Sequence, residues 1–251
     1  MAEGSSALEG RCVVLAGGSG GLGEATAKLL AAEGARLVIG YRSDHSRAMS
    51  LQPIADLRSS DIRTPEGRRA LLDAAPDLYG LVVLVGDAAR GAEEETLRRS
   101  VEINYLAPAL LARESAARMR AAGTRGAIVL LASMQAVYPF ENSTAYAAPK
   151  VALVHAARVL AKEFGGAADI RVNVVAPGVT TVGMAEASVQ SGKYERFVSG
   201  GIIPRYGRAE DVARAIRFLL EPDGYITGQV LAVDGGLTLR RDLGTIEAVG
   251  R

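Results

Sequence analysis

The segment that most constrains the fold is a glycine-rich turn placed between a short apolar run and a helical pattern. The run Cys12–Ala16 predicts a buried strand, Gly17–Gly23 follows it directly, and a helical pattern extends from Glu24 to Glu33. In this order the glycines let the backbone approach a pyrophosphate, and the helix N-terminus offers free N–H groups and the positive end of its dipole. A glycine-rich turn alone is usually only a loop. Its place between strand and helix therefore predicts the phosphate-binding start of a dinucleotide fold.

Further apolar runs recur along the chain, and helical patterns fill most of the gaps between them. Strands that are apolar on both faces and alternate with helices predict a parallel sheet covered on both sides. We therefore expect an α/β fold of one domain, a Rossmann-type doubly wound parallel sheet of about seven strands. The further runs are Arg36–Gly40, Leu51–Ala55, Leu81–Val85, Ala127–Ala132, Arg171–Val175 and Gln229–Val233, and the main helical patterns are Glu93–Ala122, Tyr146–Phe164 and Glu210–Leu220.

Some local features refine this expectation. Only Ser43–Ser50 separate the second and third runs, so the helix there must be very short or absent. Within a helix, Pro149 is tolerated only in the first turn, which predicts that its helix begins close to Tyr146. We expect residues 1–10 to be a flexible leader, 11–236 the Rossmann domain and 237–251 a C-terminal tail.

Composition narrows the function classes. The chain has 251 residues, 49% of them hydrophobic and 23% charged, and a net charge of +1, so no basic field indicates nucleic acid or an anionic membrane. No apolar stretch approaches the length of a membrane span, and the N-terminus lacks a signal pattern. The lone Cys12 cannot form an internal disulfide, which favours a cytoplasmic location. His45 and His155 stand apart from any Cys/His cluster, so we expect no metal site.

Three residues form a candidate catalytic constellation. Within a helix, Tyr146 and Lys150 lie one turn apart on the same face. A fixed ammonium beside a phenol stabilises the phenolate, so we expect the pKa of Tyr146 to fall towards neutrality. Ser133 ends the apolar run Ala127–Ala132 and is placed to hydrogen-bond a substrate oxygen in the same cleft. Taken alone, the Tyr/Lys spacing is more often an incidental pair on a surface helix.

Taken together, the motifs resemble those of the short-chain dehydrogenase/reductase family, over nearly the whole chain from Arg11 to Gly236. The nearest branch by motif is the 3-oxoacyl-acyl-carrier-protein reductase type. The matching segments are the glycine turn Ala16–Gly23, an acid–apolar pair Asp56-Leu57, Asn104, the residues Ser133, Tyr146 and Lys150, Asn173–Gly178, Pro204–Arg208, and Tyr225–Gln229 with Val233–Gly236.

The sequence also departs from the family pattern. The family's Asn-Asn-Ala-Gly after the fourth strand reads Gly86-Asp87-Ala88-Ala89, so a side-chain tie to neighbouring strands is lost while a backbone contact to the cofactor survives. The family's threonine five places after the proline is Val182, although Thr180 and Thr181 stand nearby.

The resemblance implies hydride transfer between a nicotinamide and a carbonyl or secondary alcohol. It implies that Tyr146 exchanges the proton, that Lys150 lowers the tyrosine pKa and bonds the nicotinamide ribose, that Ser133 orients the substrate oxygen, and that Asn104 holds a relay water. The cofactor-binding residues that it implies are Gly17, Ser19, Gly20, Gly21, Leu22, Tyr41, Arg42, Asp56, Leu57, Gly86, Ala88, Tyr146, Lys150, Pro177, Gly178 and Thr180.

The residues at the end of the second strand favour NADP(H) over NAD(H). NAD-specific relatives carry an aspartate there, which binds the ribose 2′-hydroxyl and repels a 2′-phosphate. Here the position is Tyr41, followed by Arg42, whose guanidinium is suited to a phosphate. Against this, Gly20 occupies the turn position that often supplies a second cation. Arg42 also has an alternative interpretation as a solvated loop residue.

Substrate identity is expected to lie in the segment 180–205, whose apolar side chains either close over a substrate or pack among themselves. We expect a small-molecule carbonyl or alcohol substrate, with an NADPH-dependent ketone reductase as the main hypothesis. Arg125 matches a basic carrier-docking position of the reductase branch, whereas Ala168 replaces a second one. The alternatives are an NAD-dependent alcohol dehydrogenase and a non-catalytic dinucleotide-binding regulatory protein, the latter suggested by the altered Gly86–Ala89 motif. The apolar residues in the segment are Met184, Val189, Tyr194, Phe197, Val198, Ile202 and Ile203.

The resemblance also implies a homo-oligomer, most simply a homotetramer. Family members pair the helices corresponding to Glu93–Ala122 and Tyr146–Phe164 across a two-fold axis. In this chain those helices carry many small and apolar residues, which would leave exposed patches on a monomer. The residues that we expect there are Ala107, Ala109, Leu110, Ala152, Val159 and Leu160. We further expect the tail after Gly236 to reach a neighbouring subunit.

Overall fold

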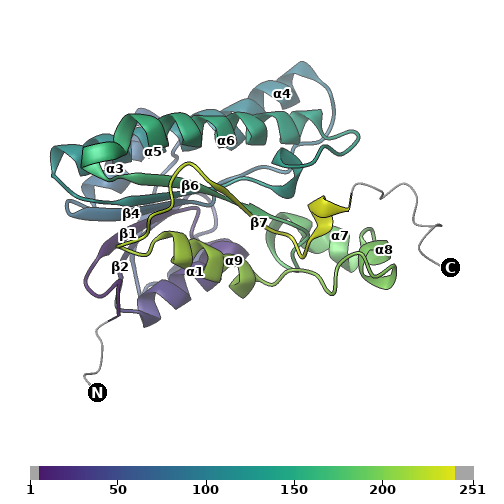
Figure 1. Cartoon of the computed structure of the whole chain (residues 1–251), viewed down its shortest axis with the longest axis horizontal. Helices are drawn as coiled ribbons and strands as arrows, with labels where there is room; N and C mark the ends of the chain where they lie inside the picture. Colours follow the sequence, from purple (N-terminus) through teal and green to yellow (C-terminus); the bar gives the residue numbers. More distant parts are fainter. Residues whose placement is uncertain (1–5, 241–251) are drawn as a thin grey trace.

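A computed structural model describes residues 6–240 and contains the expected sheet of seven strands (Figure 1). All neighbouring strands are parallel, in the order β3-β2-β1-β4-β5-β6-β7. The order reverses direction beside β1, which opens a crevice at the carboxyl ends of β1 and β4. The strands are β1 (Cys12–Ala16), β2 (Arg36–Tyr41), β3 (Asp56–Ser59), β4 (Leu78–Val83), β5 (Ala127–Leu131), β6 (Arg171–Pro177) and β7 (Val230–Val233).

Helices cover both faces of the sheet, because the side chains of the central strands alternate between two apolar cores. Val13 and Leu15 of β1 face the core under α1 and α9, whereas Cys12 and Val14 face the core under α3, α5 and α6. Figure 1 shows these two layers, with α7 and α8 beyond one end of the sheet. The helices are α1 (Gly21–Ala32), α2 (His45–Met49), α3 (Pro65–Asp73), α4 (Glu94–Val101), α5 (Ala107–Ala121), α6 (Thr144–Phe164), α7 (Glu186–Gln190), α8 (Glu195–Ser199) and α9 (Ala209–Leu219).

The third strand is the main departure from the sequence expectation. The apolar run Leu51–Ala55 forms turns, and β3 begins only after it, at Asp56. β3 is an edge strand with largely exposed residues, so it does not need the apolar run that a central strand requires. Leu51 is instead fully buried in the core under α1. As expected, only a five-residue helix, α2, joins β2 to this region.

The helices that bear the candidate site are confirmed, with two irregularities. The pattern Glu93–Ala122 is one continuous helical rod in which a π-helical segment, Glu102–Leu106, separates α4 from α5. Such segments often occur at functional sites. α6 begins at Thr144, close to Tyr146 as predicted, but the first-turn position expected for Pro149 is wrong, because this residue lies in the second turn.

Residues 6–10 and 237–240, which the sequence analysis assigned to the leader and the tail, are part of the described structure. Leu8 is fully buried, and the Gly10 amide donates to the Gly34 carbonyl at 2.9 Å, so residues 6–10 pack onto the domain. At the other end, Leu237 is fully buried in a small cluster with Phe197 and Ile203. The remaining leader, 1–5, and the tail 241–251 lie outside the described residues, as does the predicted contact of the tail with another subunit. No helix within residues 6–240 is long and apolar enough to cross a bilayer.

We expect Gly23→Ala to destabilise the fold strongly, because a Cβ there would lie 2.5 Å from the Gly18 Cα and its carbonyl oxygen. Relieving that backbone clash requires α1 to move away from the turn, and overpacking of this kind costs about 1–3 kcal/mol or more. Gly20→Ala is the matched control, since its Cβ would meet nothing closer than 3.7 Å. Urea unfolding of both variants measures the difference, and equal losses would contradict the close approach.

Candidate functional site

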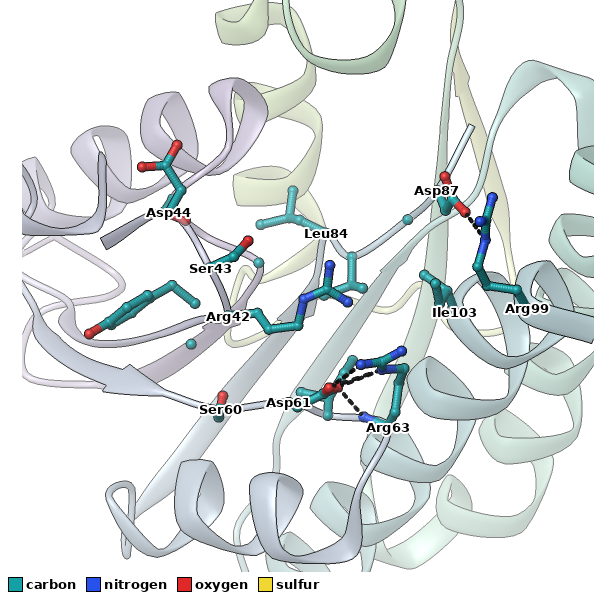
Figure 2. A pocket seen from close by; sticks show the side chains of 17 residues that line it. Arg42, Ser43, Asp44, Ser60, Asp61, Arg63, Leu84, Asp87, Arg99 and Ile103 are labelled. Carbon is teal, nitrogen blue, oxygen red and sulfur yellow. Dashed lines mark hydrogen bonds and ion pairs between the residues drawn. The ribbon is translucent and has the colours of Figure 1, made fainter. Parts of the chain in front are cut away.

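A cavity of about 720 Å³ lies at the carboxyl ends of β1, β2 and β4 (Figure 2). Its size falls within the range of small-molecule sites. Several of its walls come from elements distant in the sequence, since parallel strands bring their carboxyl ends to one edge of the sheet. The lining residues are Gly17, Ser19, Gly40, Tyr41, Arg42, Ser43, Asp44, Ser60, Asp61, Ile62, Arg63, Leu84, Val85, Gly86, Asp87, Arg99 and Ile103.

The glycine turn forms one wall of the cavity and approaches other backbone closely. Gly17 has φ +78°, a conformation that favours glycine, and a Cβ on it would lie 3.1 Å from the Val85 amide nitrogen. Gly17 and Ser19 line the cavity, while Gly20 caps α1 and Gly21 and Leu22 begin it. This close approach of backbone beside a helix N-terminus fits the pyrophosphate of a dinucleotide.

Two predicted residues, Tyr41 and Arg42, lie in the cavity wall at the end of β2. The Tyr41 hydroxyl hydrogen-bonds His45 Nδ1 at 3.0 Å. Arg42 is exposed and has no hydrogen bond or ion pair with any residue in the described range 6–240. Figure 2 shows its side chain reaching from β2 toward the part of the cavity that Asp61 and Arg63 line. A cation without an ion-pair partner in the described range therefore stands in this wall.

Sequence reasoning missed an acid near Arg42. Asp44 also lines the cavity, and its Oδ1 accepts the Arg47 N–H at 3.0 Å as the N-cap of α2. The side-chain signal was present in the sequence, since an aspartate just before a short helix is a favoured cap. The cavity wall beside β2 is therefore mixed in charge rather than purely basic.

The acid–apolar pair predicted at Asp56-Leu57 is wrong in position. Both residues lie in the first half of β3, where Asp56 is exposed and pairs with Arg58 at 2.6 Å. The cavity is instead lined by Asp61 and Ile62, just past the carboxyl end of β3. The error follows from misplacing the strand, and the second acid–apolar pair in the sequence was the signal that would have found the site.

Arg63 holds the Asp61 carboxylate through both oxygens. Its Nε donates to Oδ1 at 2.9 Å and to Oδ2 at 3.0 Å, and a terminal nitrogen also contacts Oδ2 (Figure 2). Hydrogen bonding from Arg63, with a smaller contribution from the Arg42 charge, lowers the pKa of Asp61. Beside it, the buried Ser60 Oγ has no hydrogen-bond partner among residues 6–240. Ser60 thus adds a buried hydroxyl without a partner beside the cavity, and Arg42 adds a cation without an ion-pair partner to its wall.

The four predicted catalytic residues converge next to this cavity. Ser133 follows β5 with an extended backbone and is 8% exposed. The Tyr146 phenol lies within hydrogen-bonding reach of the Ser133 hydroxyl, and Lys150 Nζ lies 5.9 Å from the centre of the Tyr146 ring. A Cβ on Gly86 would lie 3.2 Å from Asn104 Oδ1 and 3.3 Å from Lys150 Nζ. Gly86 thus stands where the cavity meets the catalytic residues.

The expected fall in the pKa of Tyr146 is not observed. Burial raises the pKa of this phenol, the hydrogen bond with Ser133 opposes the rise, and Tyr194 adds to it. The Lys150 ammonium donates to the Leu131 carbonyl at 3.0 Å and does not offset the loss of water around the phenol. Lys150 is itself 1% exposed, and burial lowers its pKa to about 8.

Asn104 lies in the π-helical segment and is fully buried. Its Nδ2 donates to the Asp87 carbonyl and to Ser100 Oγ, each at 2.9 Å, and its Oδ1 accepts the Asp87 N–H at 3.0 Å. These bonds make its amide a link between the helix and the loop after β4, and leave one acceptor lone pair for the predicted relay water. The Asp87 carboxylate pairs with Arg99 at 3.1 Å, so the altered motif is tied to α4 (Figure 2).

The other predicted cofactor residues lie around the cavity rather than in its lining. Ala88 is exposed just past Asp87, and Pro177 ends β6. A Cβ on Gly178 would lie 2.7 Å from the Asp234 Cα, and the Thr180 hydroxyl donates to the Val182 carbonyl at 3.0 Å. That bond orders the segment in which Val182 lies, and a Cβ on Gly21 would come within 2.9 Å of the Val182 Cβ.

Most apolar residues of 180–205 pack among themselves, as one of the two interpretations expected. Phe197, Ile202 and Ile203 are buried in the small cluster that contains Leu237, and Tyr194 stacks on Phe197 at its edge. Met184 is 48% exposed, with its Cε near Gly86, and Tyr194 lies close enough to Tyr146 to affect its pKa. Met184 and Tyr194 thus lie near the catalytic residues. Among residues 6–240, no group of three or more His, Cys, Asp or Glu side chains is placed to hold a metal ion.

Comparison with known proteins gives matches over nearly the whole chain. Residues 16–238 match the family model described as enoyl-(acyl carrier protein) reductase. The chain is 34% identical to cis-4-hydroxycyclohexanecarboxylate dehydrogenase of Sinomonas cyclohexanicum, with 91% of this chain and 96% of that protein covered. It is 30% identical to 3-oxoacyl-[acyl-carrier-protein] reductase FabG of Thermotoga maritima, covering 92% and 99%. The structure of a short-chain type dehydrogenase/reductase from Mycobacterium ulcerans matches with a TM-score of 0.87 at 28% identity, covering 93% and 92%.

The buried Lys150 predicts a pH dependence of stability. Its pKa is about 8 in the fold and about 10.4 when exposed, so between these values the unfolded chain binds more protons. The free energy of unfolding should therefore rise with pH across this window, by up to about 1.4 kcal/mol per unit. Urea unfolding from pH 7 to 10 should show this rise in the wild type relative to Lys150→Met, which has no titrating group. Parallel profiles would contradict it.

Proposed function

Because the chain belongs to the short-chain dehydrogenase/reductase family, in which its relatives are dehydrogenases and reductases, we propose that it is an NADPH-dependent ketone reductase. Membership makes it an oxidoreductase with a Rossmann fold; the cofactor preference and direction are our proposal. The observation that carries the proposal is the convergence of Ser133, Tyr146 and Lys150 beside a cavity whose wall holds the unpaired Arg42.

The protein's own residues divide the work of carbonyl reduction. A bound nicotinamide dinucleotide supplies the hydride. The Tyr146 hydroxyl donates a proton to the oxygen of the former carbonyl, and its raised pKa keeps it protonated and available as the acid. Ser133 donates a hydrogen bond to the same oxygen and stabilises its developing charge. Lys150 contributes positive charge from a buried position, and the Asn104 amide fixes the loop that bears Gly86.

We expect Tyr146→Phe to lose nearly all turnover while NADPH binding stays almost unchanged. The substitution removes only the hydroxyl, and general acid catalysis contributes about 10²–10⁴-fold to rate. Turnover is followed at the nicotinamide absorbance with a panel of ketones, and NADPH binding by fluorescence titration. Phe140→Leu, which leaves all four catalytic side chains in place, serves as a control. Retention of most of the wild-type rate by Tyr146→Phe would refute this mechanism.

The proposed preference for NADP(H) rests on the wall beside β2. Arg42 there is exposed and without an ion-pair partner in the described part of the chain, which suits a 2′-phosphate. Asp44 supports the alternative, NAD(H), because its carboxylate lines the same cavity. Asp44 already accepts a backbone N–H as a helix cap, so we propose that Arg42 determines the cofactor preference.

Two substitutions distinguish the cofactors. Arg42→Ala should weaken NADPH binding about tenfold or more and leave NADH binding nearly unchanged, since a charged hydrogen bond contributes ~1.5–3 kcal/mol. Asp44→Asn keeps an acceptor for the cap and removes the charge, so it should leave NADPH binding equal or tighter. Fluorescence titration with both cofactors provides the affinities. Equal losses for both cofactors in Arg42→Ala, or a selective loss of NADH binding in Asp44→Asn, would show that the protein uses NAD(H).

The substrate that we propose is a free ketone with an apolar body. Met184 and Tyr194 lie near the catalytic residues and present apolar and aromatic surface. Arg125, at the basic position noted in carrier-dependent relatives, is held by Asp169 at 2.6 Å. That ion pair partly neutralises the charge that an acidic carrier would bind. The substrate panel therefore consists mainly of cyclic and aliphatic ketones, with one 3-oxoacyl thioester for comparison.

We also propose that the protein forms a homotetramer through α4, α5 and α6. Of the residues predicted for this surface, Ala107 and Leu160 are buried within the subunit, while Val159 is 42% exposed. Val101, Leu106 and Val151 are exposed as well and extend the apolar surface. Light scattering should give a tetramer mass at micromolar concentration, and Val151→Glu with Val159→Glu should reduce it. Met49→Glu, at another exposed apolar residue, is the control, and a wild-type monomer would contradict the proposal.

A further inference from the structure

Pro149 leaves one carbonyl of the catalytic helix without its usual donor. In an α-helix each carbonyl accepts the N–H four residues later, and for Ala145 that residue is Pro149, which has no N–H. Ala145 is 1% exposed, so bulk water does not reach the freed carbonyl. A buried carbonyl of this kind needs another partner to avoid a desolvation cost. Ala145 directly precedes Tyr146, so the hydrogen bonding of this helical turn affects how Tyr146 is positioned.

Ser100 supplies the missing donor from a different helix. Its hydroxyl donates to the Ala145 carbonyl, and Ser100, near the end of α4, is fully buried. The same oxygen accepts a hydrogen bond from Asn104 Nδ2 at 2.9 Å. The hydroxyl of Ser100 is therefore used as both donor and acceptor, and joins the first turn of α6 to the π-helical segment.

Asn104 extends this connection to the cavity. Its amide bonds both the N–H and the carbonyl of Asp87, which lines the cavity next to Gly86. A continuous path of hydrogen bonds thus runs from the turn that carries Tyr146, through Ser100 and Asn104, to the loop after β4.

We propose that Ser100 is a positioning residue, whose hydroxyl replaces the amide that Pro149 lacks and so fixes Tyr146 relative to Asn104 and the cavity. Ser100 and Pro149 then form a matched pair. Restoring an N–H at position 149 should make the serine hydroxyl dispensable for the Ala145 carbonyl. The effect of this positioning on turnover rests on the proposed function, whereas the hydrogen-bond replacement does not.

Hydrogen exchange tests the replacement without any substrate. In Ser100→Ala, the amides of residues 145–148 and of Lys150 should exchange about tenfold faster, the change expected when a buried hydrogen bond is lost. Adding Pro149→Ala to Ser100→Ala returns a donor to the Ala145 carbonyl, and exchange should slow towards the wild-type rate. Ser115→Ala is the matched control, because Ser115 is also fully buried and its Oγ has no hydrogen-bond partner within residues 6–240. Failure of Pro149→Ala to reverse the effect would overturn the replacement.

Turnover tests the positioning. With the best ketone of the panel, kcat of Ser100→Ala should fall about tenfold with NADPH affinity within about twofold, and Ser100→Ala with Pro149→Ala should recover most of it. An unchanged kcat in Ser100→Ala, or an equal loss in Ser115→Ala, would show that the bond supports the fold and does not position Tyr146. Absence of turnover in the wild type would instead refute the proposed function, and hydrogen exchange would still decide whether Ser100 replaces the amide of Pro149.

Discussion

Burial of the central strands on both faces governs where polar chemistry occurs in this protein. β1, β4, β5 and β6 are buried along their whole length, so most of their side chains pack in the two apolar cores. The buried polar side chains of β6, Arg171 and Asn173, are hydrogen-bonded within the fold, and the polar side chains of the cavity gather where the strands end. Because every strand is parallel, all carboxyl ends meet at one edge, and the glycine turn, Arg42, Gly86 and Ser133 come together there.

Lys150 is a charged side chain that is buried in the same way. Its ammonium lies at 1% exposure and donates to a neutral carbonyl, with no carboxylate within ion-pair distance in the described part of the chain. A buried charge without a countercharge is costly, and a lowered pKa is the usual response. The same dry surroundings raise the pKa of Tyr146. The site thus sacrifices stability near neutral pH to place a cation and an acid side by side.

The sequence predicted the layered fold well, because strands buried on both faces require continuous apolar runs, and these runs are visible in the sequence. It failed at β3, where an edge strand needs no such run, and that single misplacement moved the predicted acid–apolar pair from Asp61 to Asp56. Asn104 was predicted from its motif, but its bond to the Asp87 carbonyl depends on how the loop after β4 packs against the helix, which the motif does not show. The pKa of Tyr146 was mispredicted for a related reason, since the spacing of Tyr and Lys gives proximity but not burial.

The contact between Gly23 and Gly18 bears on how such sequences diverge. Most tight contacts in a core join two side chains, so a change on one side can be accommodated by a later change on the other. Here a Cβ on Gly23 would meet the Cα and carbonyl of Gly18, which every amino acid possesses. No substitution at position 18 can make room. A mutation of Gly23 therefore has no compensating mutation at its neighbour, whereas a contact between two side chains can be restored by a second change.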